Sequence, residues 1–378
     1  MSKGPSGAFT VSQKTAPLRI GFAPVNDCAP IIMARELGLF ARYGLEVELK
    51  REISWSAVQS KVMDGALDAA HAPAAMPFAA NLSCERPKDH CVTGLVLSLQ
   101  GTAITLSRAV WEQAERSCDK LHEQILNSRR RRPYTFAAVF PYSSQHFLLR
   151  QWLKSIGVNP DTDVRIVMVP PDQMFPSLTL GYLDGYCAGE PWTSLAVEAR
   201  VGWCVATSAE LAPLHPEKVL MVRRDFAEKR AEEHGALIAA LMEACAFCDQ
   251  RSNRVHLSRT LADSRYVNAP ASCLNAAFVG PFEFGDERRE PLGDFVLFSR
   301  FNTNEPTADK ALWIAGRLAE MGAITDPLLL QNPAISRVFR ADIFHKANRL
   351  LIGQANQIQS EIKQYEDQFT SSGLKAAG

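Results

Sequence analysis

Two stretches with the same pattern organise the chain: ELKREISWSAVQSKVMDGALDAAHAP at residues 48–73 and IVMVPPDQMFPSLTLGYLDGYCAGEP at residues 166–191. Each contains a strand-like run, a helical run, a Gly-x-Leu-Asp motif that starts at Gly65 or Gly181, and a short apolar segment that ends at a proline. The distance between the two copies is too long for a solenoid. It predicts an α/β protein with two lobes, each built on the same strand–helix–strand unit.

The second strand of each unit ends near a polar residue, His71 in the first copy and Glu190 in the second. Ligands of open α/β sheets bind outside the carboxyl ends of the strands. Two such edges that face each other predict a ligand cleft between the lobes. The predicted organisation is a disordered leader (1–16), a discontinuous first lobe (17–103 and 217–305), a second lobe (104–216) and a helical C-terminal segment (306–378).

Composition narrows the function classes. The 378 residues are 47% apolar and 22% charged, and Lys+Arg and Asp+Glu both number 41, so there is no basic excess typical of a nucleic-acid binder. The N-terminal residues lack the apolar core of a secretory signal, and no apolar run reaches the roughly 18 residues of a membrane span. Nine scattered cysteines are typical of a reducing compartment. We therefore expect a cytoplasmic protein.

Catalytic and metal-binding motifs are missing from the sequence. It contains no Walker loop, G-x-S-x-G, HExxH or complete Rossmann fingerprint. The pair Cys245-x-x-Cys248 has zinc-like spacing but lies inside a predicted helix without a second pair, which favours core cysteines. The run Arg129 to Arg132 is typical of a solvated loop, with contact to a partner or RNA as the alternative. We expect no catalytic residue, no metal site and no cofactor.

Seven segments occur in an order that resembles a known family: GFAPVNDCAPIIMARELGLFARYGLEVEL, SWSAVQ, GALDAAHAPAAMP, FPYSSQHFLLRQWL, VPPDQMF, GEPW and HPEKVL. From Leu18 to Ala347 the chain resembles the nitrate- and bicarbonate-binding solute receptors (the NrtA/CmpA family), and among them the cytoplasmic nitrate sensors of the NasS type. The resemblance implies a type II periplasmic-binding-protein fold that holds nitrate or nitrite in its cleft. For the cytoplasmic members it implies a partner, a NasT-like RNA-binding antiterminator that is held inactive until nitrate arrives.

Three residues are the first candidates for the anion site. Trp55 lies just inside a predicted helix start, where free backbone N–H groups favour an anion, and its indole N–H can only donate; the alternative is a core tryptophan. Lys218, in HPEKVL, matches the lysine segment of the family and supplies charge and three donors; spacing alone would make it a surface lysine. Thr102 follows Gly101 at the predicted crossing between lobes, where relatives carry an amide.

The resemblance adds further candidates at the other edge of the cleft. Gln145 stands where nitrate binders carry histidine and bicarbonate binders carry glutamine, and His146 beside it could take the place of that histidine. Bicarbonate binders also tend to hold a carboxylate and a calcium ion near the lysine. His71 is either a cleft residue or a strand-end histidine. Gly189 and Glu190 of GEPW lie near the ligand, with Glu190 favoured for lobe positioning because an anion gains nothing from a carboxylate.

Two function classes follow from these residues and the resemblance. The first is a non-catalytic anion receptor: either a cytoplasmic nitrate sensor that releases its NasT-like partner on cleft closure, or the solute-binding component of a nitrate or bicarbonate transporter, which requires export. The second is a synthase of pyrimidine precursors on the same fold, but the chain lacks the cysteine- and histidine-rich active region that such enzymes need.

Overall fold

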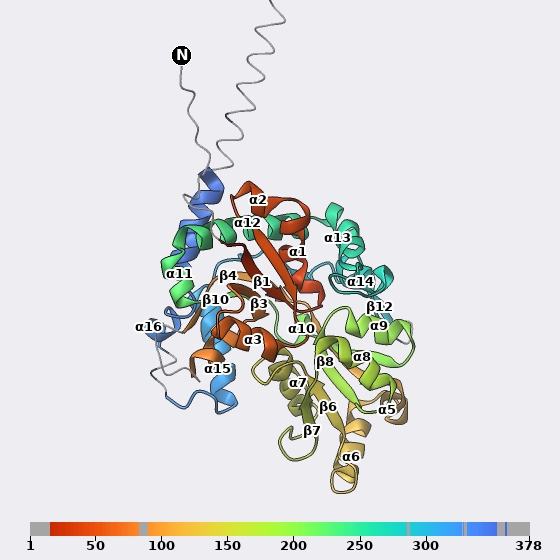
Figure 1. Cartoon of the computed structure of the whole chain (residues 1–378). Coiled ribbons are helices and arrows are strands. Elements are labelled where there is room, and N and C mark those ends of the chain that lie inside the picture. The colour runs from red at the N-terminus through yellow and green to blue at the C-terminus, as the bar shows by residue number, and fades with distance from the viewer. Residues whose placement is uncertain are drawn as a thin grey trace, which may run out of the picture.

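The strands form two main sheets, one in each half of the molecule in Figure 1. The computed structural model describes residues 16–82, 90–285, 288–326, 328, 331–353 and 360. The first sheet has the order β13-β4-β10-β3-β1-β2 and consists of β1 Leu18–Phe22, β2 Val47–Arg51, β3 Ala69–Pro73, β4 Cys91–Gln100, β10 Pro216–Arg223 and β13 Val296–Leu297. The second has the order β7-β6-β8-β5-β9 and consists of β5 Thr102–Ser107, β6 Thr135–Ala138, β7 Arg165–Met168, β8 Gly185–Gly189 and β9 Gly202–Thr207. A small hairpin, β11 Phe282–Gly285 and β12 Arg288–Glu290, packs against β9.

Helices surround both sheets (Figure 1). In chain order they are α1 Ala29–Glu36, α2 Leu39–Arg42, α3 Trp55–Met63, α4 Met76–Leu82, α5 Arg108–Gln113, α6 Cys118–Ser128, α7 Ser144–Ser155, α8 Pro171–Thr179, α9 Trp192–Glu198, α10 Ser208–Leu211, α11 Arg224–Lys229, α12 Ala231–Asp249, α13 Arg254–Leu261, α14 Ala271–Phe278, α15 Ala308–Glu320 and α16 Asn332–Ile335. Residues 341–353 are also helical, and 3-10 turns form at η1 Asn26–Cys28 and η3 Arg251–Asn253. This arrangement of two α/β lobes confirms the predicted fold class. Among the described residues, no helix is both long and apolar enough to cross a membrane.

The repeated pattern corresponds to the same unit in each sheet. The first copy is β2-α3-β3 and the second is β7-α8-β8, and in each the two strands lie on either side of a third strand, β1 or β6, with all neighbours parallel. Gly65 and Gly181 follow the two helices with φ of +82° and +75°. A left-handed residue at this position ends a helix, and glycine adopts it without steric strain.

The aspartate of each motif joins its strand to the central neighbour. The Asp68 carboxylate accepts a 2.9 Å hydrogen bond from the backbone N–H of Arg19 at the start of β1. In the second copy the Asp184 carboxylate accepts a 2.7 Å bond from the backbone N–H of Thr135 at the start of β6. The motif is therefore a local device that ends a helix and sets the register of the next strand, which explains why it recurs.

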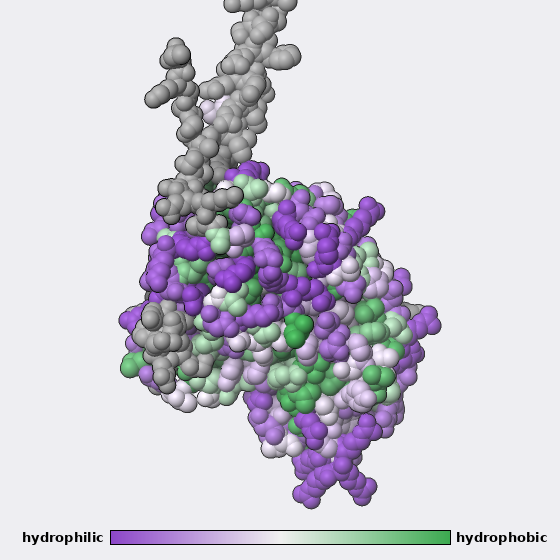
Figure 2. Space-filling view, in the orientation of Figure 1, coloured by the Kyte–Doolittle hydropathy of each residue, from purple (hydrophilic) through white to green (hydrophobic). Residues whose placement is uncertain are grey.

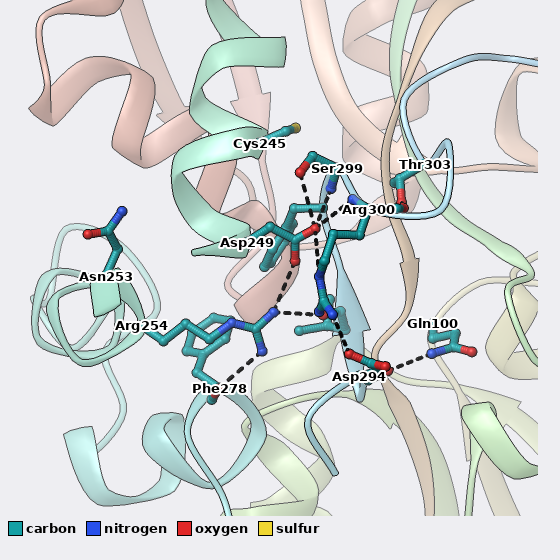
Figure 3. Close-up of polar contacts among 12 residues, drawn as sticks. Gln100, Cys245, Asp249, Asn253, Arg254, Phe278, Asp294, Ser299, Arg300 and Thr303 are labelled. Atoms are coloured by element: carbon teal, nitrogen blue, oxygen red, sulfur yellow. Dashed lines mark hydrogen bonds and ion pairs between the residues drawn. The ribbon is translucent and has the colours of Figure 1, made fainter. Parts of the chain in front are cut away.

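The chain passes from the first sheet to the second between β4 and β5, and it returns between β9 and β10. The side chain of Gln100 connects these two crossings. Gln100, the last residue of β4, and Gly101 before β5 have φ of +60° and +96°, and this left-handed pair turns the chain from one sheet into the other. The Gln100 amide donates to the Asp294 carbonyl oxygen and accepts from the backbone N–H of Leu214, both at 2.7 Å. Figure 3 shows Gln100 next to Asp294 at this crossing.

A buried ion pair fixes the end of α12 beside the crossing. The Asp249 carboxylate accepts a 3.0 Å bond from Arg254 and further bonds from the backbone N–H groups of Ser299 and Arg300 (Figure 3). Arg254 also donates to the Phe278 carbonyl oxygen at 3.1 Å. These bonds hold the segment before α15 against the first lobe.

The charged stretch at residues 108–133 contains α5 and α6, and Leu121 and Ile125 of α6 are buried in the core of the second lobe. The run Arg129 to Arg132 forms an exposed turn after α6, as the solvated-loop interpretation predicted. Arg129 pairs with Asp163 at 3.1 Å, and α6 lies at the hydrophilic tip at the bottom of Figure 2. Cys245 is buried in α12, as predicted for a core cysteine. The predicted leader, apart from residue 16, and most of the chain after 353 lie outside the described residues.

Candidate functional site

Polar side chains from both sheets meet in one buried group between the lobes. We call the set Asp27, Ser144, Gln145, His215, Glu217 and Lys218 the buried polar cluster. Asp27 lies in η1 after β1, and Glu217 and Lys218 lie in β10 of the first sheet. Ser144 and Gln145 form the first turn of α7 in the second lobe, where Ser143 caps the helix by accepting from the backbone N–H of His146. All six residues are at most 3% exposed.

Lys218 points inward and is only 1% exposed, so it is not a solvated surface lysine. Its Nζ atom lies 2.8 Å from Asp27 Oδ2, 2.5 Å from Glu217 Oε1 and 5.5 Å from the centre of the Trp55 ring. Burial acts to lower the pKa of Lys218, but the two carboxylates outweigh it and raise the pKa above its ordinary value. The ammonium group is therefore charged at neutral pH.

Glu217 joins the two lobes. Its carboxylate accepts hydrogen bonds from Ser144 Oγ and Gln145 Nε2 on α7, and it also binds Lys218 and lies 3.0 Å from His215 Nε2. Burial acts to raise the pKa of Glu217, but the attraction of Lys218 and the bond from His215 outweigh it and hold the pKa below its ordinary value. This carboxylate is ionised, and it ties the N-terminus of α7 to β10.

Trp55 and His71 pack next to Asp27 and Lys218 on one side of the cluster. The rings of Trp55 and His71 lie 5.3 Å apart, and His71 Nε2 lies 2.9 Å from Asp27 Oδ1. Burial lowers the pKa of His71 more than Asp27 raises it, so the imidazole is neutral at pH 7. Burial acts to raise the pKa of Asp27, but Lys218 and His71 together lower it to about 2. One lysine charge thus faces two ionised carboxylates.

The predicted residues of the second lobe separate into two groups. Gln145 belongs to the cluster, whereas His146 faces away from it: its Nδ1 lies 2.5 Å from the Pro141 carbonyl oxygen. Burial also lowers the pKa of His146. The structure therefore does not bring His146 to the position of a histidine donor, because the backbone turn before α7 already binds its ring.

Gly189, Glu190 and Thr102 lie where the lobes touch. Thr102 pairs with Gly189 across β5 and β8, and a Cβ at Gly189 would meet Val25 Cγ1 of the first lobe at 3.5 Å. The Glu190 carbonyl oxygen accepts a 2.7 Å bond from the backbone N–H of Asn26, which directly bridges the lobes. This bond uses the backbone of Glu190 and not its carboxylate, so the lobe-positioning role expected of that side chain stays a prediction.

Several buried polar atoms near these residues lack a hydrogen-bond partner in the described part of the chain. They include the Trp55 indole N–H, both amide atoms of Asn26 and Glu190 Oε1. The Thr102 hydroxyl lies near the Cys187 thiol but makes no bond of good geometry with a described residue. Buried polar groups in folded proteins are nearly always satisfied, so these unpaired atoms can bind a small polar molecule such as water or an anion.

The carboxyl group of Glu190 is buried without a cationic partner among the described residues. It is 1% exposed, and its Oε2 atom accepts a 3.1 Å bond from the backbone N–H of Ser194. Burial raises the pKa of Glu190 to about 7, because the bonds from the start of α9 only partly offset the loss of water. The group is close to half protonated at neutral pH.

A calcium ion, which the resemblance associates with bicarbonate binders, does not fit between these carboxylates. The Lys218 ammonium already lies between Asp27 Oδ2 and Glu217 Oε1. Calcium takes roughly six to eight oxygen ligands. Within the described ranges, no group of three or more His, Cys, Asp and Glu side chains is arranged to hold a metal ion.

Sequence reasoning missed Glu217, Asp27, Ser144 and Asn26. Neighbours in a regular strand point to opposite faces, so Lys218 in the cleft implied that Glu217 points away. In the structure, the pairing of β10 with β4 is irregular on both sides of Lys218, and such a bulge re-aims side chains. Asn26 and Asp27 lie in the segment VNDCAP and Glu217 lies in HPEKVL, both within the segments that carry the resemblance. The position of Glu217 depends on a β-bulge that sequence periodicity does not reveal.

The two lobes have the fold of the type II periplasmic-binding-protein class. The crystal structure of the periplasmic nitrate-binding protein NrtA from Synechocystis matches with a TM-score of 0.82 at 24% identity, over 91% of each chain. The aliphatic sulphonate-binding protein SsuA from Escherichia coli matches with a TM-score of 0.58 at 17% identity, over 86% of this chain and 92% of SsuA. At these identities the matches establish the fold.

Sequence comparison identifies the family. The model of the NMT1-like family matches residues 12–262. The chain is 30% identical to the bicarbonate-binding protein CmpA of Synechococcus over 366 residues, which cover 92% of this chain and 80% of CmpA. It is 37% identical to the nitrate import ATP-binding protein NrtC of Synechocystis over 88% of this chain, but it spans only about half (50%) of NrtC. The chain belongs to the NMT1-like family, in the group of NrtA/CmpA-type solute-binding proteins.

Proposed function

We propose that the chain is a non-catalytic receptor for a small planar oxyanion of the nitrate and bicarbonate class, bound between its lobes. The observation that carries the proposal is the convergence of Gln145 from α7 and Lys218 from β10 in the buried polar cluster. The Trp55 ring lies 5.5 Å from Lys218 Nζ, and its indole N–H, like the amide of Asn26 next to Asp27, is a buried donor without a partner among the described residues. An oxyanion in a buried site requires several such donors from more than one direction.

Nitrate, with nitrite, is the first candidate ligand because the chain is most similar, among the relatives described above, to NrtC. Bicarbonate is the second candidate, for two reasons. Gln145 is the residue that the resemblance associates with bicarbonate binders. Glu190 Oε1 is a buried acceptor without a partner among the described residues. Bicarbonate carries one O–H that could donate to this acceptor, whereas nitrate and nitrite only accept.

We further propose that anion binding is reported to a NasT-like antiterminator in the cytoplasm. Support comes from the resemblance and from a route of contacts to the surface helix α15. The His215 ring packs against Trp313 of α15 in a tilted arrangement with the ring centres 5.3 Å apart, and Trp313 also meets Phe147 of α7 edge to face at 6.4 Å. His215 also binds Glu217. A change at the buried polar cluster that moves α7 or β10 would therefore alter the contacts of α15. A solute-binding part of a nitrate or bicarbonate transporter remains the second function, supported by the match to half of NrtC.

Calorimetric titration with nitrate, nitrite and bicarbonate tests the receptor. We expect at least one anion to bind with one-to-one stoichiometry and Lys218→Ala to abolish or strongly weaken the binding. Heat of dilution alone for all three anions would refute the receptor. Size-exclusion chromatography with a NasT-like protein, with and without the bound anion, separates the functions: the sensor forms a complex that the anion dissociates, and the transporter component forms none.

A further inference from the structure

Glu217 occupies the donors that the proposed anion needs. Its carboxylate holds Gln145 Nε2 and Ser144 Oγ from the second lobe and Lys218 Nζ from the first. A carboxylate is a flat anion with two accepting oxygens, like one edge of nitrate or bicarbonate. We propose that Glu217 is a built-in competitor of the anion: it closes the lobes on itself, and an entering oxyanion binds by displacing it. The inference rests on the proposed function, since it concerns the same donors.

The charges of the cluster make simultaneous binding unfavourable. Asp27 and Glu217 already outnumber Lys218, so a second anion next to an undisplaced Glu217 would add a third negative charge to a buried site with one lysine. Each donor hydrogen also serves only one strong charge-assisted bond at a time. Movement of the Glu217 side chain away from α7 would release Gln145 and Ser144 and leave Lys218 paired with Asp27.

The irregular pairing of β10 explains how Glu217 reaches this position. Lys218 and Glu217 are neighbours, yet both side chains enter the same cluster because the register with β4 shifts on each side of Lys218. The carboxylate is 0% exposed, so water does not compete for its bonds to α7. These bonds close the lobes without any external ligand, and opening of the cleft has to break them.

Titrations of substituted proteins test the competition. Glu217→Ala removes the competitor, and Glu217→Gln keeps the volume but removes the charge. We expect both to bind nitrate or bicarbonate about 10-fold or more tightly than the wild type, the factor that corresponds to one charge-assisted hydrogen bond no longer broken on entry. Formate should also bind to Glu217→Ala, in the space of the missing carboxylate, and compete there with the larger anion.

Asp27→Asn is the matched control. It removes one negative charge from the same lysine but touches neither Ser144 nor Gln145. If Glu217 acts by occupying the donors, Asp27→Asn tightens binding clearly less than the two Glu217 variants. An equal gain in affinity for Asp27→Asn would attribute the tighter binding to the loss of any negative charge near Lys218 and not to the release of the donors. Weaker or unchanged anion binding in both Glu217 variants would overturn the proposal.

Small-angle X-ray scattering gives a readout that does not depend on anion affinity, and one of its tests needs only the wild type. In anion-free buffer we expect the wild type and Asp27→Asn to have the radius of gyration of the closed form and Glu217→Ala to be more expanded. A wild type that is open without anion and closes on its addition refutes the competitor even if the Glu217 variants do not fold. If neither the wild type nor any folded variant binds nitrate, nitrite or bicarbonate, the receptor function fails, and scattering still decides whether Glu217 closes the lobes.

Discussion

The carboxyl group of Glu190 should make the protein less stable as the pH rises. Burial raises the pKa of Glu190 from its ordinary value of 4.5 to about 7, because only the first turn of α9 donates to it. Between these two pH values the folded chain holds the proton that the unfolded chain releases. The free energy of unfolding therefore falls with pH across this window, and the loss is complete above about pH 7.

The size of the effect follows from the shift. A difference of about 2.5 pKa units corresponds to about 3 kcal/mol at 1.36 kcal/mol per unit. Glu190→Gln removes the ionisation but keeps an oxygen that can accept from the backbone N–H of Ser194. The substitution should leave stability nearly unchanged at pH 4.5 and raise the free energy of unfolding by up to about 3 kcal/mol at pH 8.

Urea unfolding followed by circular dichroism at several pH values between 4.5 and 8, in buffers free of nitrate and carbonate, measures this difference. Glu232→Gln, at an exposed position in the first turn of α12, is the matched control, since it removes a carboxylate that solvent already stabilises. The reasoning is refuted if the gain from Glu190→Gln is the same at pH 4.5 and pH 8, or if the variant is less stable at pH 8.

Three further predictions concern the anion site, the Gly-x-Leu-Asp motif and the response of a NasT-like partner to the anion. Trp55→Ala and Lys218→Ala should each weaken anion binding by about 1–3 kcal/mol in calorimetry, the effect of a lost buried or charged donor. Gly181→Ala should lower the free energy of unfolding by about 1–2 kcal/mol, because φ is +75° and nothing else obstructs a Cβ; an unchanged urea midpoint contradicts this. Trp313→Ala should leave the anion titration unchanged but weaken the effect of the anion on co-elution with a NasT-like partner; an unaltered response rules out α15 as the reporter.

The lobes could be predicted from the sequence because their signals are local. Gly65 and Gly181 end helices through a left-handed conformation, and Asp68 and Asp184 bind the adjacent strand. The Gly-x-Leu-Asp motif therefore occurs twice because the same backbone geometry occurs twice. Pairing of strands that are adjacent in the sheet but distant in the chain did not have to be known for this step. The domain boundaries stay predictions.

The site was predictable only in part because its arrangement depends on long-range packing. Lys218 and Gln145 were found through the resemblance, but Glu217 was not, because regular alternation would point it away from Lys218 and a bulge in β10 overrides that alternation. His146 was a plausible donor until the Pro141 carbonyl oxygen was seen to bind its ring. Gln145 and His146 are neighbours on the first turn of α7, and no local sequence pattern distinguishes them. The backbone turn before the helix decides which of the two points into the buried polar cluster.

The carboxylates of the cluster are compatible with an anion receptor once the ligand-free state is considered. A buried lysine without a counter-charge would lose its proton or destabilise the fold, because burial disfavours its charged form. A receptor spends part of its time without ligand, so Lys218 needs an internal counter-ion in that state, and Asp27 and Glu217 supply it. Asp27 contacts only the first lobe, whereas Glu217 also reaches α7 and can be exchanged for the ligand. On this argument, Glu217→Gln should be less stable than the wild type in anion-free solution, and added nitrate or bicarbonate should restore more stability to the variant than to the wild type.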